Sequence, residues 1–368
     1  MNDPIRILHV VGGMGPGGLE TMIMNWYRKI DKSKFQFDFL VHHKEKCFYD
    51  DEIEALGGRI HHLSLANDHN FIKYWFDLKR FFKENKQYKI LHGHHSTFGV
   101  FYLSAAKRGG IKWRISHSHI ASYSKTLRGI IFYLFSRLFK KSANVHYACS
   151  KLAGDYMYGN SKYIVINNGI DTNRFKFSYT DREYIRKQMG LDDNFVVCHV
   201  GRFFDQKNHD FLIDIYYDFL KKQSNSYLLL IGVGPLQDAI RKKVQRLQID
   251  NRVIFLNEQR DIPAFLSASD LFLFPSLYEG LPLTLVEAQT SGLPILCSDT
   301  ISTEAQINSN YFVLSLSDSA AVWAEKMCKI KDISNDRVAA FEKVKENCYD
   351  SEDVVRFVQE QYLLMSKS

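Results

Sequence analysis

The stretch at residues 271–297, LFLFPSLYEGLPLTLVEAQTSGLPILC, decides the expected fold of the chain. Its apolar run at 271–274 predicts a strand buried on both faces, and Pro275 ends that strand. Pro282 suits the first position of a helix, because its φ is already helical and its missing N–H costs no hydrogen bond there. The helix is expected to end near Gly292, and a second apolar run follows. The pattern therefore predicts a strand–loop–helix–strand unit of a parallel α/β sheet.

Two glutamates of this stretch, Glu279 in the loop and Glu287 in the helix, can face the same crevice. The free N–H groups and the partial positive charge at the start of the helix suit a phosphate. A carboxylate further along the helix can accept hydrogen bonds from sugar hydroxyls. Considered alone, each of the two glutamates could equally be a ligand-binding residue or a solvated surface residue.

The segment SLYEGLPLTLVEAQTSGLP, at 276–294, resembles the E-x7-E signature of the retaining glycosyltransferases of family 4, which have the two-domain GT-B fold. The resemblance implies that Glu279 contacts the donor sugar and that Glu287 binds the ribose of a nucleotide-sugar. The further donor-binding residues that it implies within this segment are Gly280, Leu281 and Pro282.

At 368 residues the chain is longer than one hydrophobic core usually serves, so we expect two domains. The expected parts are an acceptor-side domain at 1–175, a nucleotide-sugar domain at 176–350 and a C-terminal helix at 351–368. In the resembled family this last helix packs back toward the first domain. The six cysteines have no metal-binding spacing, and they are expected to be reduced core residues of a cytoplasmic protein.

The net charge of +7 is unevenly distributed along the chain. Residues 1–175 hold 26 Lys and Arg against 14 Asp and Glu, whereas the remainder holds 22 against 27. This basic first half predicts an anionic surface or acceptor, and nucleic acid is not expected because no binding motif appears. The segment KTLRGIIFYLFSRLFKK, at 125–141, is either a core helix or a helix lying on an anionic membrane. With no signal peptide and no apolar run of about 18 residues, we expect a cytoplasmic protein that contacts the inner membrane face peripherally.

An apolar strand at 5–11 leads into the glycine-rich loop GGMGPGGLE. Its glycines allow a backbone to approach a ligand closely at a helix N-terminus, although a tight turn without a ligand explains them too. In the resembled family this loop borders the donor phosphate and the acceptor, and the matching positions are Gly17 and Gly18.

Further strands are expected at 35–41, 59–63, 88–92, 113–117 and 145–149, with helices between them. This alternation predicts a doubly wound sheet, whose ligands lie beyond the carboxyl ends of the strands. Histidines follow two of these strands, at His94 and His95 and at His117 and His119. A lone histidine is usually structural, but an imidazole can titrate near neutral pH and can bond to sugar hydroxyls. The family has a histidine near the reacting sugar, for which His117 is the first choice.

The remaining acceptor-side candidates are His119, His94 and Asn168, the last within VINNGIDTNRF. This segment is expected to end the first domain, and the polar residues 172–193 are expected to cross between domains.

The strand expected at 195–200 opens the second sheet and runs into GRFFDQKNH. Arg202 and Lys207 can together neutralise a diphosphate, one through a bidentate fork and the other as a point charge. As single loop residues they are more often solvated charges, but their spacing matches the resembled family, in which two such cations hold the donor diphosphate. The family binds the base near Asn257 and Arg260, although this chain has Asn257 where glycine is usual.

The chain is therefore predicted to be a retaining glycosyltransferase that moves a sugar from a nucleotide-sugar, most simply a UDP-sugar, to a glycan or lipid-linked acceptor. No Asp-x-Asp sequence is present, so neither a metal nor another cofactor is expected. Alternatives of the same architecture are a nucleotide-sugar 2-epimerase and a phosphorylase, and an alternative of another class is a non-catalytic partner of a transferase.

Overall fold

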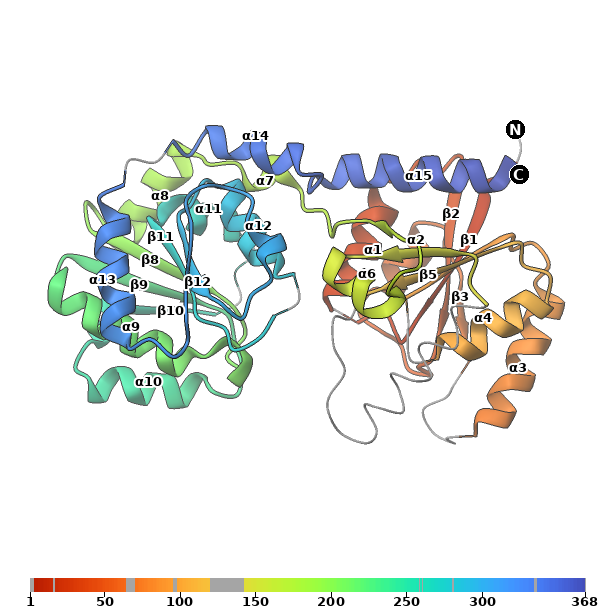
Figure 1. Ribbon diagram of the computed structural model, residues 1–368, viewed down its shortest axis with the longest axis horizontal. Helices are drawn as coiled ribbons and strands as arrows, with labels where there is room; N and C mark the ends of the chain where they lie inside the picture. The colour runs from red at the N-terminus through yellow and green to blue at the C-terminus, as the bar shows by residue number, and fades with distance from the viewer. Residues whose placement is uncertain are drawn as a thin grey trace. The chain divides into compact units, whose positions relative to one another are not determined.

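The computed structural model describes residues 3–15, 17–63, 70–94, 98–119, 142–257, 259, 261–279, 281–333 and 336–367. It divides the chain into two compact units (Figure 1). Unit 1 consists of Met1–Gly169 together with Ser351–Ser368, and unit 2 is Ile170–Asp350. The segment at 125–141 lies outside the described residues, so both of its interpretations stay predictions.

Unit 1 contains a parallel sheet whose described strands lie in the order β3-β2-β1-β4-β5-β6-β7. The strands are β1 Ile5–Val11, β2 Phe35–Val41, β3 Ile60–His62, β4 Ile90–Gly93, β5 Trp113–Ser118, β6 Val145–Ala148 and β7 Ile164–Val165. The described helices are α1 Gly18–Lys29, α2 Asp50–Ala55, α3 Phe71–Glu84, α4 Gly99–Arg108, α6 Lys151–Tyr158 and α15 Ser351–Lys367. The order reverses beside β1, which is the doubly wound pattern that the sequence predicts.

Alternate residues of β1 point to opposite faces of the sheet of unit 1. Ile7 packs with α1 and α15 in one hydrophobic cluster, whereas Leu8 packs with α3 and α4 in another. The helix α15 supplies Val355 and Tyr362 to the first cluster, although it follows β1 by more than 300 positions. The last helix of the chain is thus part of the core of unit 1.

Unit 2 contains a second parallel sheet, with its described strands in the order β10-β9-β8-β11-β12-β13. The strands are β8 Phe195–Val200, β9 Ser226–Ile231, β10 Val253–Leu256, β11 Leu271–Phe274, β12 Ile295–Ser298 and β13 Tyr311–Leu314. The α-helices are α7 Thr172–Phe175, α8 Tyr179–Met189, α9 His209–Lys222, α10 Gln237–Arg246, α11 Ile262–Ala268, α12 Leu283–Thr290, α13 Ala320–Lys331 and α14 Ala339–Glu346. Short 3-10 turns are η2 Asp205–Lys207, η3 Asp250–Arg252 and η4 Thr303–Ala305.

The segment at 172–193 forms part of unit 2, which corrects the expectation that it crosses between domains. Here α7 and α8 pack within this unit, and the backbone of Ile170 donates to that of Tyr349 over 2.9 Å. The division of the chain consequently falls after Gly169, whereas the sequence-based boundary lies at residue 175. None of the helices that the structure describes is long and apolar enough to cross a membrane.

The strand–loop–helix–strand unit predicted at 271–297 is present as β11, α12 and β12. The strand β11 is buried throughout and pairs with β8 on one side and β12 on the other. Pro282 lies one position before the helix, at its N-cap with ψ near 110°, rather than at its first position. Gly292 follows the helix with φ near +66°, a conformation that favours glycine.

Candidate functional site

A cavity of about 480 Å³ lies at the carboxyl ends of β8 and β9 in unit 2. Its lining residues are Val200, Gly201, Arg202, Ile231, Gly232, Gln259 and Ile262. Parallel α/β sheets bind ligands at this edge, where the loops that follow the strands diverge. The cavity is therefore a candidate binding site of this unit.

Glycines bring the two loops beside this cavity close together. A Cβ atom on Gly232, which has φ near +143°, would lie 2.2 Å from the carbonyl oxygen of Gly201. At Gly234 it would lie 2.6 Å from the carbonyl oxygen of Phe203. Any larger residue would push these loops apart, so the shape of the cavity depends on both glycines.

Lys207 and Glu279 form an ion pair at the same edge of the sheet. The Nζ atom of Lys207 donates to Oε1 of Glu279 over 2.6 Å, and their side chains are only 17% and 8% exposed. Three more hydrogen bonds join the two segments, Leu277 N to Gln206 O, Gln206 Nε2 to Tyr278 O and Asn208 Nδ2 to Pro275 O. The loop after β11 is thus fastened to the turn η2, and two of the sequence-predicted site residues meet.

Arg202 differs from Lys207 in being exposed and in having no carboxylate within ion-pair distance among the described residues. Its guanidinium carbon lies 5.1 Å from the ring centre of Phe204, which steadies the side chain at the mouth of the cavity. Arg202 therefore retains donors for an anionic ligand.

Glu287 lies on α12 as a half-buried carboxyl. Burial raises its pKa from 4.5 to about 7, and the guanidinium of Arg174 acts in the opposite direction. An acid with such a pKa changes charge near neutral pH, which is typical of ligand-binding and catalytic positions. Arg174, on α7, is a residue that the sequence reasoning passed over; its place in NGIDTNRF next to the predicted domain end was the available signal.

The other donor-side candidates fall into three groups. Gly280 and Arg260 lie outside the described residues. Pro282 is buried and Leu281 packs against the hydrophobic cluster of unit 2, so their side chains serve the core. Asn257 is exposed and accepts from Gln237 over 3.4 Å, whereas Gln259, which sequence reasoning did not single out, lines the cavity.

In unit 1, Gly17 caps α1 and both Gly17 and Gly18 are exposed. The carboxylate of Glu20 folds back over this helix start, where a Cβ atom on Gly17 would lie 2.2 Å from its Oε2. Asn168 is half-buried, and its Oδ1 has no hydrogen-bond partner among the described residues.

The three candidate histidines of the described region do meet at the carboxyl ends of β4 and β5; His95 lies outside that region. His94 Nδ1 lies 3.1 Å from His119 Nε2, and the rings of His117 and His119 are 4.2 Å apart. Burial lowers the pKa of His94 and His117 well below 6.5 and that of His119 to about 3. The expectation that they titrate near neutral pH is therefore wrong, since burial disfavours the charged imidazole.

Neutral imidazoles are also metal ligands, and the ligand atoms of two sets of three histidines lie within 4.8 Å of one another in the described part of the chain. The sets are His9, His92 and His94, and His94, His117 and His119.

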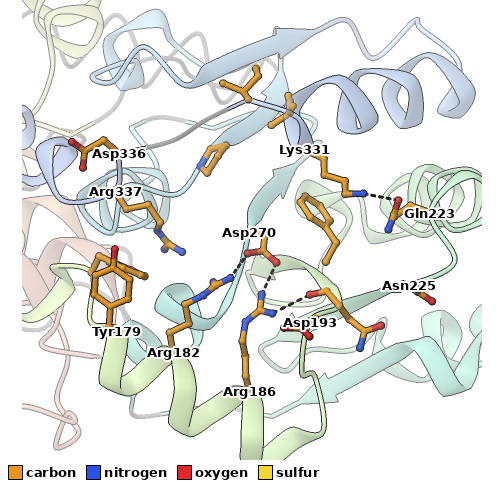
Figure 2. A pocket seen from close by; sticks show the side chains of 16 residues that line it. Tyr179, Arg182, Arg186, Asp193, Gln223, Asn225, Asp270, Lys331, Asp336 and Arg337 are labelled. Atoms are coloured by element: carbon orange, nitrogen blue, oxygen red, sulfur yellow. Dashed lines mark hydrogen bonds and ion pairs between the residues drawn. The ribbon is translucent and has the colours of Figure 1, made fainter.

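A second cavity in unit 2, of about 870 Å³, lies at the opposite edge of the sheet, and three arginines are among the residues that line it (Figure 2). Arg182 and Arg186 both donate to Asp270, at 2.6 and 2.5 Å. Arg337 donates to the backbone oxygens of Leu266, Ser267 and Ser269, in the last turn of α11 and at its C-cap. These guanidiniums hold the end of α11 and the start of β8 in place, so we assign the cluster a structural role.

Comparison with known proteins places this geometry in a family. Residues 16–174 match the model described as Glycosyltransferase Family 4, and residues 181–347 match the model described as Glycosyl transferases group 1. The chain is 35% identical over 334 residues to the "Putative glycosyltransferase EpsF" of Bacillus subtilis, covering 88% of this chain and 87% of that one. It is 25% identical over 335 residues to the UDP-Gal:alpha-D-GlcNAc-diphosphoundecaprenol alpha-1,3-galactosyltransferase of Escherichia coli, covering 86% of each.

Solved structures share the fold at lower identity. Anabaena Alr3699/HepE, crystallised with UDP, superposes with a TM-score of 0.80 at 19% identity, covering 97% of this chain and 99% of that one. A glycosyltransferase from Rickettsia africae superposes with a TM-score of 0.79 at 15% identity over all of both chains. Two Rossmann-like sheets, the meeting of Lys207 with Glu279 and the two family matches lead to one conclusion: the chain belongs to the GT-B glycosyltransferases of family 4.

Proposed function

We propose that this glycosyltransferase retains the configuration of the transferred sugar and takes that sugar from a UDP-sugar. The observation that carries the proposal is the Lys207–Glu279 pair, which stands beside the cavity at the carboxyl edge of the second sheet. In the proposal Lys207 and Arg202 bind the diphosphate, Glu279 contacts the sugar, and Glu287 accepts hydrogen bonds from the ribose. Gln259 and the backbone near Asn257 contact the base.

The same residues suggest how the donor reacts. Departure of the diphosphate leaves negative charge on its oxygens, and two nearby cations stabilise that charge as it develops. A hydroxyl of the acceptor then bonds to the sugar on the face that the diphosphate leaves, and the departing phosphate takes the hydroxyl proton. This charge can be supplied by Arg202 and Lys207, so the proposal needs neither a metal ion nor another cofactor.

The acceptor is proposed to be a glycan or a lipid-linked sugar of cell-surface polysaccharide synthesis. Support comes from the relative in Escherichia coli, whose name specifies a diphosphoundecaprenol-linked acceptor. The test begins with a panel of nucleotide-sugars in calorimetry, followed by transfer to soluble and to lipid-linked acceptors. Retention is read from the anomeric configuration of the product by NMR. Transfer that EDTA abolishes and Mg²⁺ or Mn²⁺ restores would contradict the metal-free part, and free sugar formed without an acceptor would favour the epimerase.

The affinity for UDP is expected to rise between pH 6 and pH 8. Because the pKa of Glu287 is about 7, its carboxyl is mostly protonated at pH 6 and accepts ribose hydroxyls less well than the carboxylate does. Calorimetry across this range should show a gain of up to about tenfold, as one charge-assisted hydrogen bond would supply. Glu287→Gln should show weaker binding and no such rise, whereas Glu325→Gln, at an ion pair on the surface, should follow the wild type.

The free energy of unfolding should change with pH in the opposite direction, because of the same Glu287 carboxyl. An acid whose pKa is raised on folding stabilises the protonated folded state, so its contribution to the free energy of unfolding is lost as pH rises from 4.5 to about 7. A UDP affinity that stays flat while this stability change appears would place Glu287 outside the nucleotide site.

The first half of the chain is also proposed to work at the inner surface of the cytoplasmic membrane. Its excess of Lys and Arg supports this, since each such residue near an anionic surface contributes roughly 1 kcal/mol that salt screens. Co-sedimentation with vesicles should require anionic lipid and should weaken at high salt. Equal binding to neutral and anionic vesicles, or none to either, would contradict the proposal.

A further inference from the structure

Five histidines gather beneath α1 and α15 on one face of the sheet of unit 1. Four of them are at most 4% exposed and the fifth is half-buried. They are His9 of β1, His92 and His94 of β4 and its end, and His117 and His119 of β5 and its end. So many imidazoles in one apolar core call for an explanation, because each carries two polar nitrogens that burial penalises when they are unpaired.

The histidines form two separate hydrogen-bonded chains. In the first, Tyr362 Oη lies 2.6 Å from His92 Nδ1, and His92 Nε2 lies 3.1 Å from His117 Nδ1. In the second, His9 Nδ1 lies 3.0 Å from His94 Nε2, whose other nitrogen lies 3.1 Å from His119 Nε2.

Two of the three bonded ring pairs lie end to end with nearly parallel planes, whereas the third pair, His94 and His119, is tilted by 34°. The ring centres of His92 and His117 are 5.2 Å apart with an angle of 20° between the ring planes, while their bonded nitrogens are 3.1 Å apart. The ring centres of His9 and His94 are 5.3 Å apart with an angle of 10° between the ring planes, and their bonded nitrogens are 3.0 Å apart. Nitrogens that face each other along a shared plane make N–H···N hydrogen bonds, whereas a shared cation would need lone pairs converging on one point. Hydrogen bonding thus accounts for the close nitrogens.

The direction of the first chain follows from Tyr362. Its ring is fully buried, burial keeps the pKa of the phenol well above 10, and His92 is the partner that the structure gives its hydroxyl. The structure gives the O–H no other partner among the described residues, so we assign the phenol as the donor to Nδ1 of His92, which is then the lone-pair nitrogen. A neutral His92 then carries its proton on Nε2 and donates it to Nδ1 of His117.

His117 consequently holds its own proton on Nε2. That nitrogen is buried and has no hydrogen-bond partner among the described residues. The ring is held in place by Trp26, stacked at 6.0 Å, and by the edge of Tyr147 at 5.9 Å. A buried donor without an acceptor lowers the stability of the folded protein, and a ligand oxygen that accepts from it would remove this penalty.

We propose that Tyr362 is a positioning residue for catalysis, which acts through His92 to hold His117 as an Nε2–H donor toward a hydroxyl oxygen of the donor sugar. The contact with the sugar rests on the proposed function; the tautomer does not. His117 then binds and orients the sugar and moves no proton. The second chain lacks such an anchor, because Nε2 of His9 has no partner among the described residues, and its direction stays open.

NMR of the chain labelled with ¹⁵N-histidine tests the tautomer without any substrate. His117→Leu identifies the His117 signals by subtraction from the spectrum. In the wild type, Nδ1 of His117 should appear as an unprotonated acceptor and Nε2 as a protonated nitrogen. A protonated Nδ1 in the wild type would overturn the proposal.

Tyr362→Phe removes the hydroxyl and keeps the ring, so the His117 signals should become a mixture of the two tautomers. The kcat for sugar transfer should fall about tenfold, with the KM for the acceptor unchanged, as expected for the loss of one oriented hydrogen bond. Tyr74→Phe is the matched control, since Tyr74 is also buried and its hydroxyl lies 2.6 Å from Nε2 of His42. This control should leave both the His117 signals and kcat unchanged.

Two results would overturn the role of Tyr362: an unchanged His117 spectrum in Tyr362→Phe, or an equal fall of kcat in both tyrosine variants. Wild-type kcat in His117→Leu would instead contradict the contact between His117 and the sugar. In that case the spectra would still decide whether Tyr362 sets the tautomer.

Discussion

Lys207→Met is expected to lower kcat for sugar transfer by at least about 100-fold, the usual effect of removing a group that stabilises developing charge. Lys207 is held at 2.6 Å from Glu279, and its Nζ lies 4.5 Å from the ring centre of Phe274. Arg202 remains in the variant, but it is exposed and carries only part of the proposed diphosphate contact. The measurement is the initial rate of UDP release from the UDP-sugar that the calorimetric panel identifies.

Lys243→Met provides the matched control for this variant. Lys243 belongs to the same unit, is 13% exposed against 17% for Lys207, and pairs with Asp210 and Asp214 at 2.9 and 2.8 Å. It should lose stability without a comparable loss of kcat. Wild-type kcat in Lys207→Met, or the same loss in both variants, would show that Lys207 has no part in departure of the diphosphate.

Asp270→Ala should lower the free energy of unfolding by about 3 kcal/mol, because it removes the shared carboxylate of a half-buried, hydrogen-bonded charge cluster. The carboxylate accepts from Arg182 and Arg186 and from the backbone of Val196, at 2.8 Å. Burial already lowers the pKa of the neighbouring Arg337 to about 9, with Arg182 adding repulsion. Without Asp270, less negative charge would offset the repulsion among the three guanidiniums shown in Figure 2.

The comparison for Asp270 is Asp218→Ala, which breaks a surface pair with Lys221 on α9. Such pairs contribute about 0–1 kcal/mol, so urea unfolding of the full chain should barely change. UDP affinity should survive in Asp270→Ala at a temperature where the protein is folded, because the cluster lies at the opposite edge of the sheet from the proposed donor site. Equal stability of the two variants would contradict the structural role of the cluster.

Sequence patterns predicted the elements that have a clear apolar period. The strands β2, β8 and β11 match the expected ranges, because their buried residues form nearly continuous runs. The helix α8 was missed because none of its residues is buried, which removes the periodic signal. The residues that cap this helix were still recognisable in the sequence. At its start the side chain of Ser178 accepts a hydrogen bond from the backbone of Asp181, and at its end Gly190 adopts the left-handed conformation.

Candidate site residues could be named where a motif fixes their spacing, but the contacts between distant positions could not be predicted. Glu279 and Lys207 were predicted from two separate motifs. They are 72 positions apart in the sequence, and their ion pair becomes visible only in the folded chain. His9 was passed over because it stands inside an apolar run, where its polarity looks incidental. Tyr362 is 270 positions from His92, and no local pattern marks a phenol on an amphipathic helix as a hydrogen-bond donor to a particular imidazole.

Unit 1 is built from two segments that are far apart in the sequence, and this determines when during synthesis each unit can finish folding. Unit 2 is one continuous piece of chain, whereas unit 1 needs α15 to complete the cluster that holds Ile7 and Trp26. Domains commonly fold in order from the N-terminus as the ribosome produces them. Here unit 1 is completed last, since one face of its sheet is covered only in part, by α1, until residues 351–367 have been translated. A chain truncated after Asp350 and released from the ribosome should therefore hold a protease-resistant unit 2 and a protease-sensitive unit 1.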